Sequence, residues 1–151
     1  MPFVFQMKKN SVPFEILAIE EDGFHLLVEA MLNGRKARLL IDTGASRTVF
    51  DRERISRFIP GAELQPTNKA STGLGTDDML THWVTLEEFV MGDLVISGMQ
   101  IILLDMMHVN GSYEKLGYAA IDGVLGNDLL MKYNALIDYR SKTMTLQVPL
   151  S

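Results

Sequence analysis

An apolar run that ends in a carboxylate constrains this chain more than any other feature. Residues 39–44 read Leu-Leu-Ile-Asp-Thr-Gly, so three large aliphatic residues lead directly into Asp42, a hydroxyl and a glycine. Such a run is typical of a buried strand. An ionised carboxylate at the end of a buried strand loses hydration, and a fold tolerates that cost when the charge is paired, shared or used. The sequence therefore predicts a strand that delivers a paired or functional acid to its end.

The rest of the chain repeats short apolar stretches that are separated by turn residues. Two strands are predicted at 24–31 and 36–42, joined by Asn33-Gly34, a dipeptide that tolerates the positive φ angles of a tight hairpin. Further strands are predicted from alternating or continuous apolar residues at 79–90, 94–107 and 119–126, with two more within 135–148.

Helical signals are few. A short helix or helical turn is predicted within 47–61, where Pro60-Gly61 ends it, and a second at 127–134, where Asn or Asp can act as the N-cap. Residues 108–118 are predicted to form a loop. Many short strands, two brief helices and no alternation of strands with helices favour a mainly β, barrel-like fold. The length of 151 residues predicts a single domain spanning 1–151.

Composition excludes several classes of function. A formal charge of -5 without a long basic cluster argues against a nucleic-acid partner, and the absence of cysteine removes disulfides and thiolate chemistry. His25, His82 and His108 lack the spacing of metal ligands, so we expect no metal and no cofactor. No apolar run reaches membrane-spanning length, and the N-terminus has the reverse of a signal-peptide pattern. We therefore expect no membrane association and a cytoplasmic location.

Three segments carry a resemblance to a known family. The stretch LLIDTGASRTVF resembles the Asp-Thr-Gly motif of aspartic proteases, and its Ala45 is similar to the form found in the single-domain, retroviral-type branch, the retropepsins. The stretch IDGVLGNDLL at 121–130 resembles the apolar-apolar-Gly strand and short helix of that family. Gly73, Leu74 and Gly75 sit where the family has its substrate-covering flap. The three segments follow the family's order and span roughly residues 24–148.

The resemblance implies a fold and an activity. The fold is a closed, β-barrel-like acid protease half-fold with one or two short helices. The activity is that of an aspartic endopeptidase, a hydrolase that acts on peptide or protein substrates. The resemblance makes Asp42 the catalytic acid, with Thr43, Gly44 and Ala45 as active-site support and residues 73–75 as flap and substrate-binding residues.

Hydrolysis by carboxylates needs two of them, because one must act as base toward water while the other donates a proton. Asp42 is the only one of the ten aspartates that is followed by Thr-Gly or Ser-Gly. The partner acid is therefore expected from a second copy of the chain across a twofold axis. This reasoning predicts a homodimer with two Asp42 carboxylates at its centre.

Other interpretations remain open at this point. Asp42 is compatible with an ordinary strand-end turn, and Asp122 is a rival partner acid within one chain, although a turn or polar-network role suits it better. Retroviral proteases often carry an acidic residue and an arginine where this chain has Ser46 and Asn127. These departures motivate an alternative function, a catalytically weak or inactive module that binds peptides or acts as a scaffold.

Overall fold

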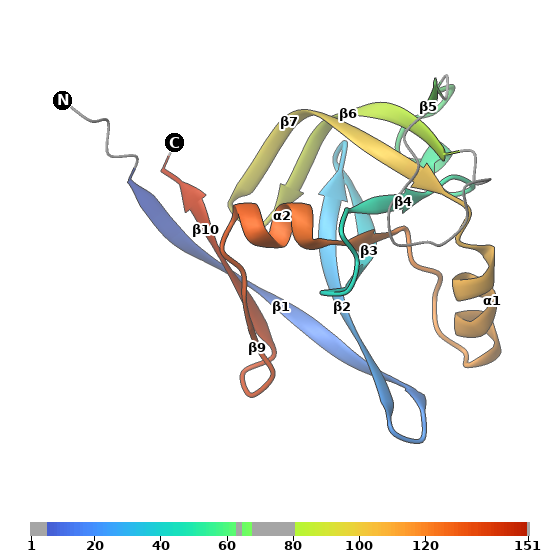
Figure 1. Ribbon diagram of the computed structural model, residues 1–151, viewed down its shortest axis with the longest axis horizontal. Helices are drawn as coiled ribbons and strands as arrows, with labels where there is room; N and C mark the ends of the chain where they lie inside the picture. The colour runs from blue at the N-terminus through green and yellow to red at the C-terminus, as the bar shows by residue number, and fades with distance from the viewer. Residues whose placement is uncertain (1–5, 63–64, 68–80, 151) are drawn as a thin grey trace.

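The computed structural model describes residues 6–62, 65–67 and 81–150. Strands dominate it, as predicted (Figure 1). The strands are β1 (Met7–Glu20), β2 (Gly23–Leu32), β3 (Arg35–Ile41), β4 (Val49–Asp51), β5 (Gln65–Thr67), β6 (Thr81–Met91), β7 (Leu94–Leu104), β8 (Gly123–Leu125), β9 (Leu136–Asp138) and β10 (Thr143–Pro149). The helices are η1 (Ile55–Arg57), a single 3₁₀ turn, with α1 (Met107–Lys115) and α2 (Asn127–Lys132).

Six strands close into a barrel. Their order is β2-β3-β8-β4-β7-β6, and β6 returns to β2 through the antiparallel pairs Met31 with Val90 and Leu32 with Phe89. The interior holds one large apolar cluster, in which Leu32, Leu39 and Phe89 are fully buried. The mainly β, closed-barrel fold class is confirmed.

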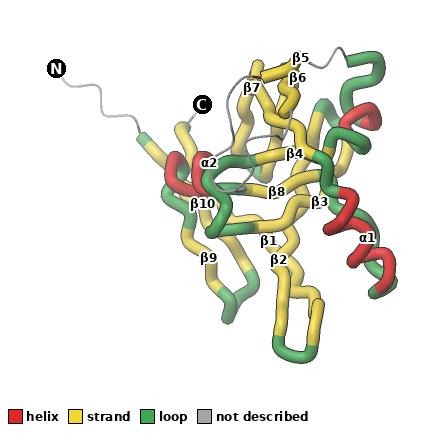
Figure 2. The backbone as a smooth tube through the Cα atoms, turned by 45° about the vertical axis from the view of Figure 1, so that its right-hand side comes forward, coloured by secondary structure: helices red, strands yellow, loops and turns green. Residues whose placement is uncertain are grey.

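The two ends of the chain form a second region of sheet beside the barrel (Figure 2). The first half of β1 pairs with β10, and its second half, from Phe14 onward, pairs with β2. Pro13 stands at this change of partner, where its missing N–H is tolerated. β9 pairs only with β10 and is an edge strand.

The prediction of a loop at 108–118 is wrong, because the helix α1 occupies most of this segment. The strand that was predicted to reach residue 107 ends earlier, at Leu104. Asn110 exchanges two hydrogen bonds with the backbone of Ile121, donating to its carbonyl oxygen at 3.2 Å and accepting from its N–H at 2.8 Å. Tyr113 is buried in a small second cluster against β2. Tertiary contacts thus stabilise a helix that Asn110 and Gly111 disfavour locally.

Of the short helix or helical turn predicted within 47–61, the structure has the single turn η1, and β4 takes the start of the segment. Val49 pairs with Ile102 on one side and Val124 on the other, so β4 fills the gap between β7 and β8. This position buries Phe50 completely. Closing the barrel therefore decides the conformation here. Among the described residues, none of the helices has the length and apolarity needed to cross a membrane.

Candidate active site

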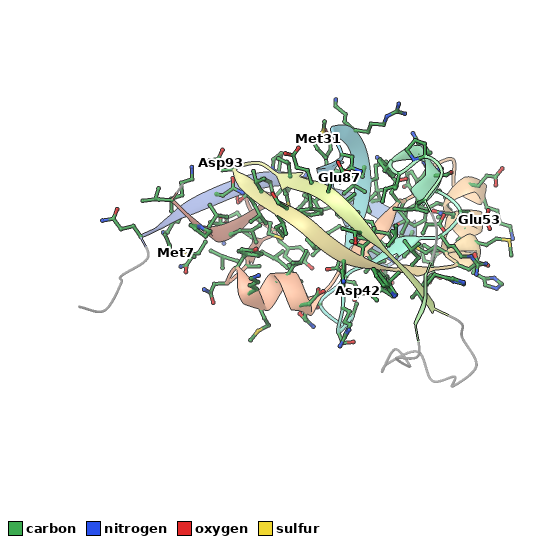
Figure 3. All side chains as sticks on the ribbon, turned by 90° about the horizontal axis from the view of Figure 1, so that it is seen from above. Met7, Met31, Asp42, Glu53, Glu87 and Asp93 are labelled. Carbon is green, nitrogen blue, oxygen red and sulfur yellow. The ribbon has the colours of Figure 1, made fainter. Side chains whose placement is uncertain are left out.

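The parallel strands β3 and β8 position the candidate acid. Residues 39–41 pair in register with residues 123–125. The backbone N–H of Asp42 extends this pairing by one residue, since it donates to the carbonyl oxygen of Leu125 at 3.0 Å. Figure 3 shows Asp42 on the side of the molecule that also carries α2. The predicted apolar strand therefore ends with a half-buried carboxylate held on its backbone.

A tight turn surrounds this carboxylate. The N–H of Gly44 donates to Oδ1 of Asp42 at 2.8 Å, and the N–H of Ala45 donates to the Asp42 carbonyl oxygen at 3.2 Å. A Cβ atom at position 44 would lie 3.2 Å from the same Oδ1, closer than most side chains allow. Glycine therefore leaves room for the carboxylate and still supplies it with a hydrogen-bond donor.

Asn127, at the start of α2, holds the turn through two hydrogen bonds. Its side-chain Nδ2 donates to the carbonyl oxygen of Thr43 at 2.7 Å, and its backbone N–H donates to the carbonyl oxygen of Ala45 at 2.9 Å. Asn127 stands where the retroviral pattern has an arginine. A neutral amide thus holds the loop of this chain.

A second set of hydrogen bonds ties the far end of the loop to the same helix. Oδ1 of Asp128 accepts from the N–H of Thr48 at 2.8 Å and from its hydroxyl at 2.7 Å. The Thr48 hydroxyl in turn accepts from the N–H of Gly126 at 3.0 Å. Thr48 is buried, so these bonds are shielded from water. No local motif linked Thr48 with Asp128, although an acid in the first turn of a helix is a recognisable signal.

Two glycines allow β8 and the residue that follows it to pass very close to residues 47–49. A Cβ atom on Gly126 would lie 2.5 Å from the carbonyl carbon and oxygen of Arg47, and one on Gly123 would lie 2.7 Å from the carbonyl oxygen of Val49. Neither contact is possible for a larger residue without moving the backbone. The glycines of the apolar-Gly motif are therefore required by the close approach of β8 to residues 47–49.

Asp42 opens into a cavity of about 240 Å³. Its walls come from β2, from the end of β3 and from β9 with the residue that follows it: Phe24, His25, Leu26, Leu40, Ile41, Asp42, Thr43, Ile137 and Tyr139. Aromatic and aliphatic side chains share these walls with polar groups, and Asp42 is the one carboxylate that lines this cavity among the described residues. A hollow whose walls combine apolar side chains with polar groups can hold a ligand.

Asp122 lies at the opposite end of the β3–β8 pair, where its backbone N–H donates to the carbonyl oxygen of Arg38 at 2.8 Å. Its side chain is 3% exposed. Nε of Arg54 donates to its Oδ1 at 2.7 Å, Arg57 lies 3.6 Å from the same atom, and the backbone N–H of Arg38 donates to its Oδ2 at 2.9 Å. The polar-network interpretation of Asp122 is confirmed, and its charge is neutralised.

The structure thus brings together Asp42, Thr43, Gly44 and Ala45, which form one turn at the end of β3. Gly73, Leu74 and Gly75 lie outside the described residues, so the flap stays a prediction. No three His, Asp or Glu side chains are grouped as metal ligands within the ranges that the structure describes. His25 and Tyr139 join the cavity from distant parts of the sequence, which no local motif indicated.

Comparison with known proteins agrees with this geometry. A family model described as aspartyl protease matches residues 28–129, which is more than half of the chain. The fold is similar to that of a retropepsin-like aspartic protease from Rickettsia conorii, with a TM-score of 0.58 and 16% identity over 100% of this chain and 99% of the other. It is also similar to the retroviral protease-like domain of Ddi1 from Leishmania major, with a TM-score of 0.53 and 14% identity over 83% and 92% of the two chains. No curated protein matches the sequence. The chain belongs to the aspartyl protease family and has the retropepsin-like fold.

Proposed function

We propose that this protein is an aspartic endopeptidase that works as a homodimer, with one Asp42 from each copy. The observation that carries the proposal is the state of the Asp42 carboxylate. It opens into a cavity, accepts a hydrogen bond from the Gly44 N–H, and forms no ion pair with a cation of the described residues. An acid in this setting lies within reach of a water molecule or substrate in the cavity.

The chemistry follows from placing two such acids side by side. Two close carboxylates cannot both ionise readily, so the pair shares one proton. The ionised member takes a proton from a water molecule, whose oxygen attacks the peptide carbonyl carbon, while the protonated member donates to the carbonyl oxygen. Breakdown of the tetrahedral intermediate then returns a proton to the leaving amine and breaks the C–N bond.

The second acid is proposed to come from a second copy because the described part of this chain offers none at the site. Asp122 is the rival within the chain, but it lies at the other end of the β3–β8 pair and is bound by Arg54. No carboxylate other than Asp42 lines the cavity among the described residues. A twofold axis close to Asp42 would supply the missing partner.

Substitution and subunit mixing test this proposal together. Asp42→Asn should lower kcat for a cleaved peptide at least about a thousandfold, because the variant pair has no ionisable base. Asp22→Asn is the matched control, since Asp22 is exposed in the turn between β1 and β2. When wild-type and Asp42→Asn subunits are mixed and allowed to exchange, activity should fall as the square of the wild-type fraction.

Other outcomes have distinct meanings. A linear fall in the mixing experiment would mean that each copy has a complete site, which contradicts the shared pair. Full cleavage by purified Asp42→Asn would contradict the role of this residue. A protein that dimerises and binds peptides without cleaving them would favour the peptide-binding module instead.

A further inference from the structure

A histidine stands in the cavity beside Asp42 and has no part in the proposed proton transfers. His25 lies on β2, is half-buried, and lines the same hollow of about 240 Å³ as the carboxylate. The two ring nitrogens of a histidine have separate roles, and the partner of one decides where the proton of the other lies. The residues around His25 define the role of each of its ring nitrogens.

Tyr113 holds the first ring nitrogen. Nδ1 of His25 lies 2.7 Å from the hydroxyl oxygen of Tyr113, which comes from α1. Tyr113 is 1% exposed. Burial raises the pKa of Tyr113 to about 12, although the nearby charge of Arg38 opposes this, so the phenol keeps its proton at neutral pH.

The direction of this hydrogen bond follows from the acceptor that is available to the Tyr113 hydroxyl proton. A buried hydroxyl proton without an acceptor is costly, and among the described residues His25 Nδ1 is the hydrogen-bond partner of the Tyr113 hydroxyl. Tyr113 therefore donates, and Nδ1 of a neutral His25 accepts. The ring proton is then on Nε2. No described residue forms a hydrogen bond with Nε2, so this N–H is available to a ligand.

Part of the cavity wall offers apolar contact to the body of an aromatic side chain. Phe24, Leu40 and Ile137 supply apolar and aromatic walls from β2, β3 and β9, and Tyr139 adds to them just after β9. Asp42 faces the same space, and its negative charge disfavours a carboxylate there. A ligand group with an aromatic body and an uncharged oxygen at its tip meets these conditions.

We propose that His25, held by Tyr113, is a specificity-determining residue that favours tyrosine over phenylalanine beside the cleaved peptide bond. Nε2–H of His25 donates to the phenol oxygen of the substrate, and Tyr113 acts as a positioning residue that keeps the donor on Nε2. The inference rests on the proposed function, since it assigns one substrate subsite of that enzyme. A site that binds a substrate hydroxyl discriminates against the analogue without it.

The test uses two peptides that differ only in Tyr or Phe next to the cleaved bond. The ratio of kcat/KM for Tyr over Phe should be at least about ten in the wild type, fall to about one in His25→Phe, and be partly restored in His25→Gln, which keeps a donor. His108→Phe is the matched control, because His108 is exposed on α1 and lies outside the cavity. A wild-type ratio near one overturns the inference.

Tyr113→Phe provides a second route that does not require a substitution at His25. The ¹⁵N chemical shifts of the His25 ring should show a proton on Nε2 and none on Nδ1 in the wild type, with mixed tautomers in Tyr113→Phe. The Tyr over Phe ratio should fall with this change. A ring proton on Nδ1 in the wild type contradicts the inference.

Binding separates this inference from the proposed function. Analogues of both peptides with a reduced, uncleavable bond can be titrated calorimetrically into wild-type protein. A preference for the Tyr analogue without cleavage of either parent peptide would support the subsite and contradict the enzyme. Cleavage of both peptides with equal binding of the analogues would support the enzyme and contradict the subsite.

Discussion

The two ends of the β3–β8 strand pair each carry an aspartate, and their surroundings differ. Asp122, which precedes β8, is fully engaged by Arg54, Arg57 and the backbone of Arg38. Asp42, which follows β3, accepts one hydrogen bond from Gly44 and forms no ion pair with a described residue. The same residue type beside the same pair of strands is neutralised at one end and left available at the other.

The difference separates a structural acid from a chemical one. A buried carboxylate whose oxygens all have partners holds neighbouring elements together. A carboxylate with one backbone donor and an open side can be reached by a bound water molecule or ligand. Ion pairing by neighbouring segments, rather than position at a strand end, distinguishes the two.

The largest expected effect is on the free energy of unfolding and concerns Asp122, the acid that is paired with arginine. Asp122→Ala should lower the free energy of unfolding by about 3 kcal/mol, because it leaves Arg54 and Arg57 without their partner. Asp42→Ala should change it by less than about 1 kcal/mol. Urea denaturation of both variants measures the difference. Equal losses would mean that the two acids have the same role.

The next effect concerns the chain crossing near the Asp42 end. Gly126→Ala should cost about 1–3 kcal/mol, because its Cβ would lie 2.5 Å from the Arg47 carbonyl group. Gly111→Ala is the matched control: no atom lies within 4 Å of its Cβ, and alanine favours the helix α1. The control should be neutral or stabilising in thermal unfolding. A neutral Gly126→Ala would mean that the crossing tolerates a wider spacing.

A smaller effect distinguishes the stability contributions of the two arginines that contact Asp122. Arg54 is 28% exposed and lies 2.7 Å from the carboxylate, whereas Arg57 is 54% exposed and lies 3.6 Å away. Arg54→Met should therefore cost about 1–2 kcal/mol, and Arg57→Met less than about 1 kcal/mol, because solvent screens the outer pair. Chemical denaturation at low and high salt tests the order. A larger loss for Arg57→Met would reverse the assignment.

The smallest effect appears only at high pH and concerns Tyr113, the hydrogen-bond partner of His25. Burial raises the pKa of Tyr113 from 10.0 to about 12, so the folded state binds its proton more tightly than the unfolded state. The stabilisation is complete below pH 10 and is lost as the pH rises toward 12. Near the middle of this range the loss relative to Tyr113→Phe should be about 1 kcal/mol. If the free energies of unfolding of the wild type and Tyr113→Phe changed in parallel with pH, the raised pKa of Tyr113 would be contradicted.

Local signals predicted a large part of this structure. Asn33-Gly34 predicted the turn between β2 and β3, and Asn33 does adopt a positive φ of 49°. The apolar-Gly motif before Asn127 predicted β8 and α2 in order. The Asp-Thr-Gly motif predicted one turn around Asp42, which the hydrogen bonds of Gly44 and Ala45 form. Each of these features depends on residues that are neighbours in the sequence.

Other features had no local signal. β1 alternates between exposed and buried residues from Lys9 to Phe14, but buried Asn10 hides that period because its side chain is polar. Its amide is satisfied by the turn after β6: Nδ2 donates to the Met91 carbonyl oxygen at 2.9 Å, and Oδ1 accepts from the Asp93 N–H at 3.0 Å. Partners so distant in the sequence cannot be identified from local periodicity.

By itself the sequence determined a β-rich chain with a carboxylate at the end of an apolar strand, because side-chain period, turn dipeptides and close glycine packing act over a few residues. Only the tertiary structure decided which aspartate is paired with arginine and which faces a cavity. It also placed His25 and Tyr139 in the walls of that cavity and brought Tyr113 from α1 into contact with His25. Charge pairing and cavity walls depend on distances in space, which barrel closure defines.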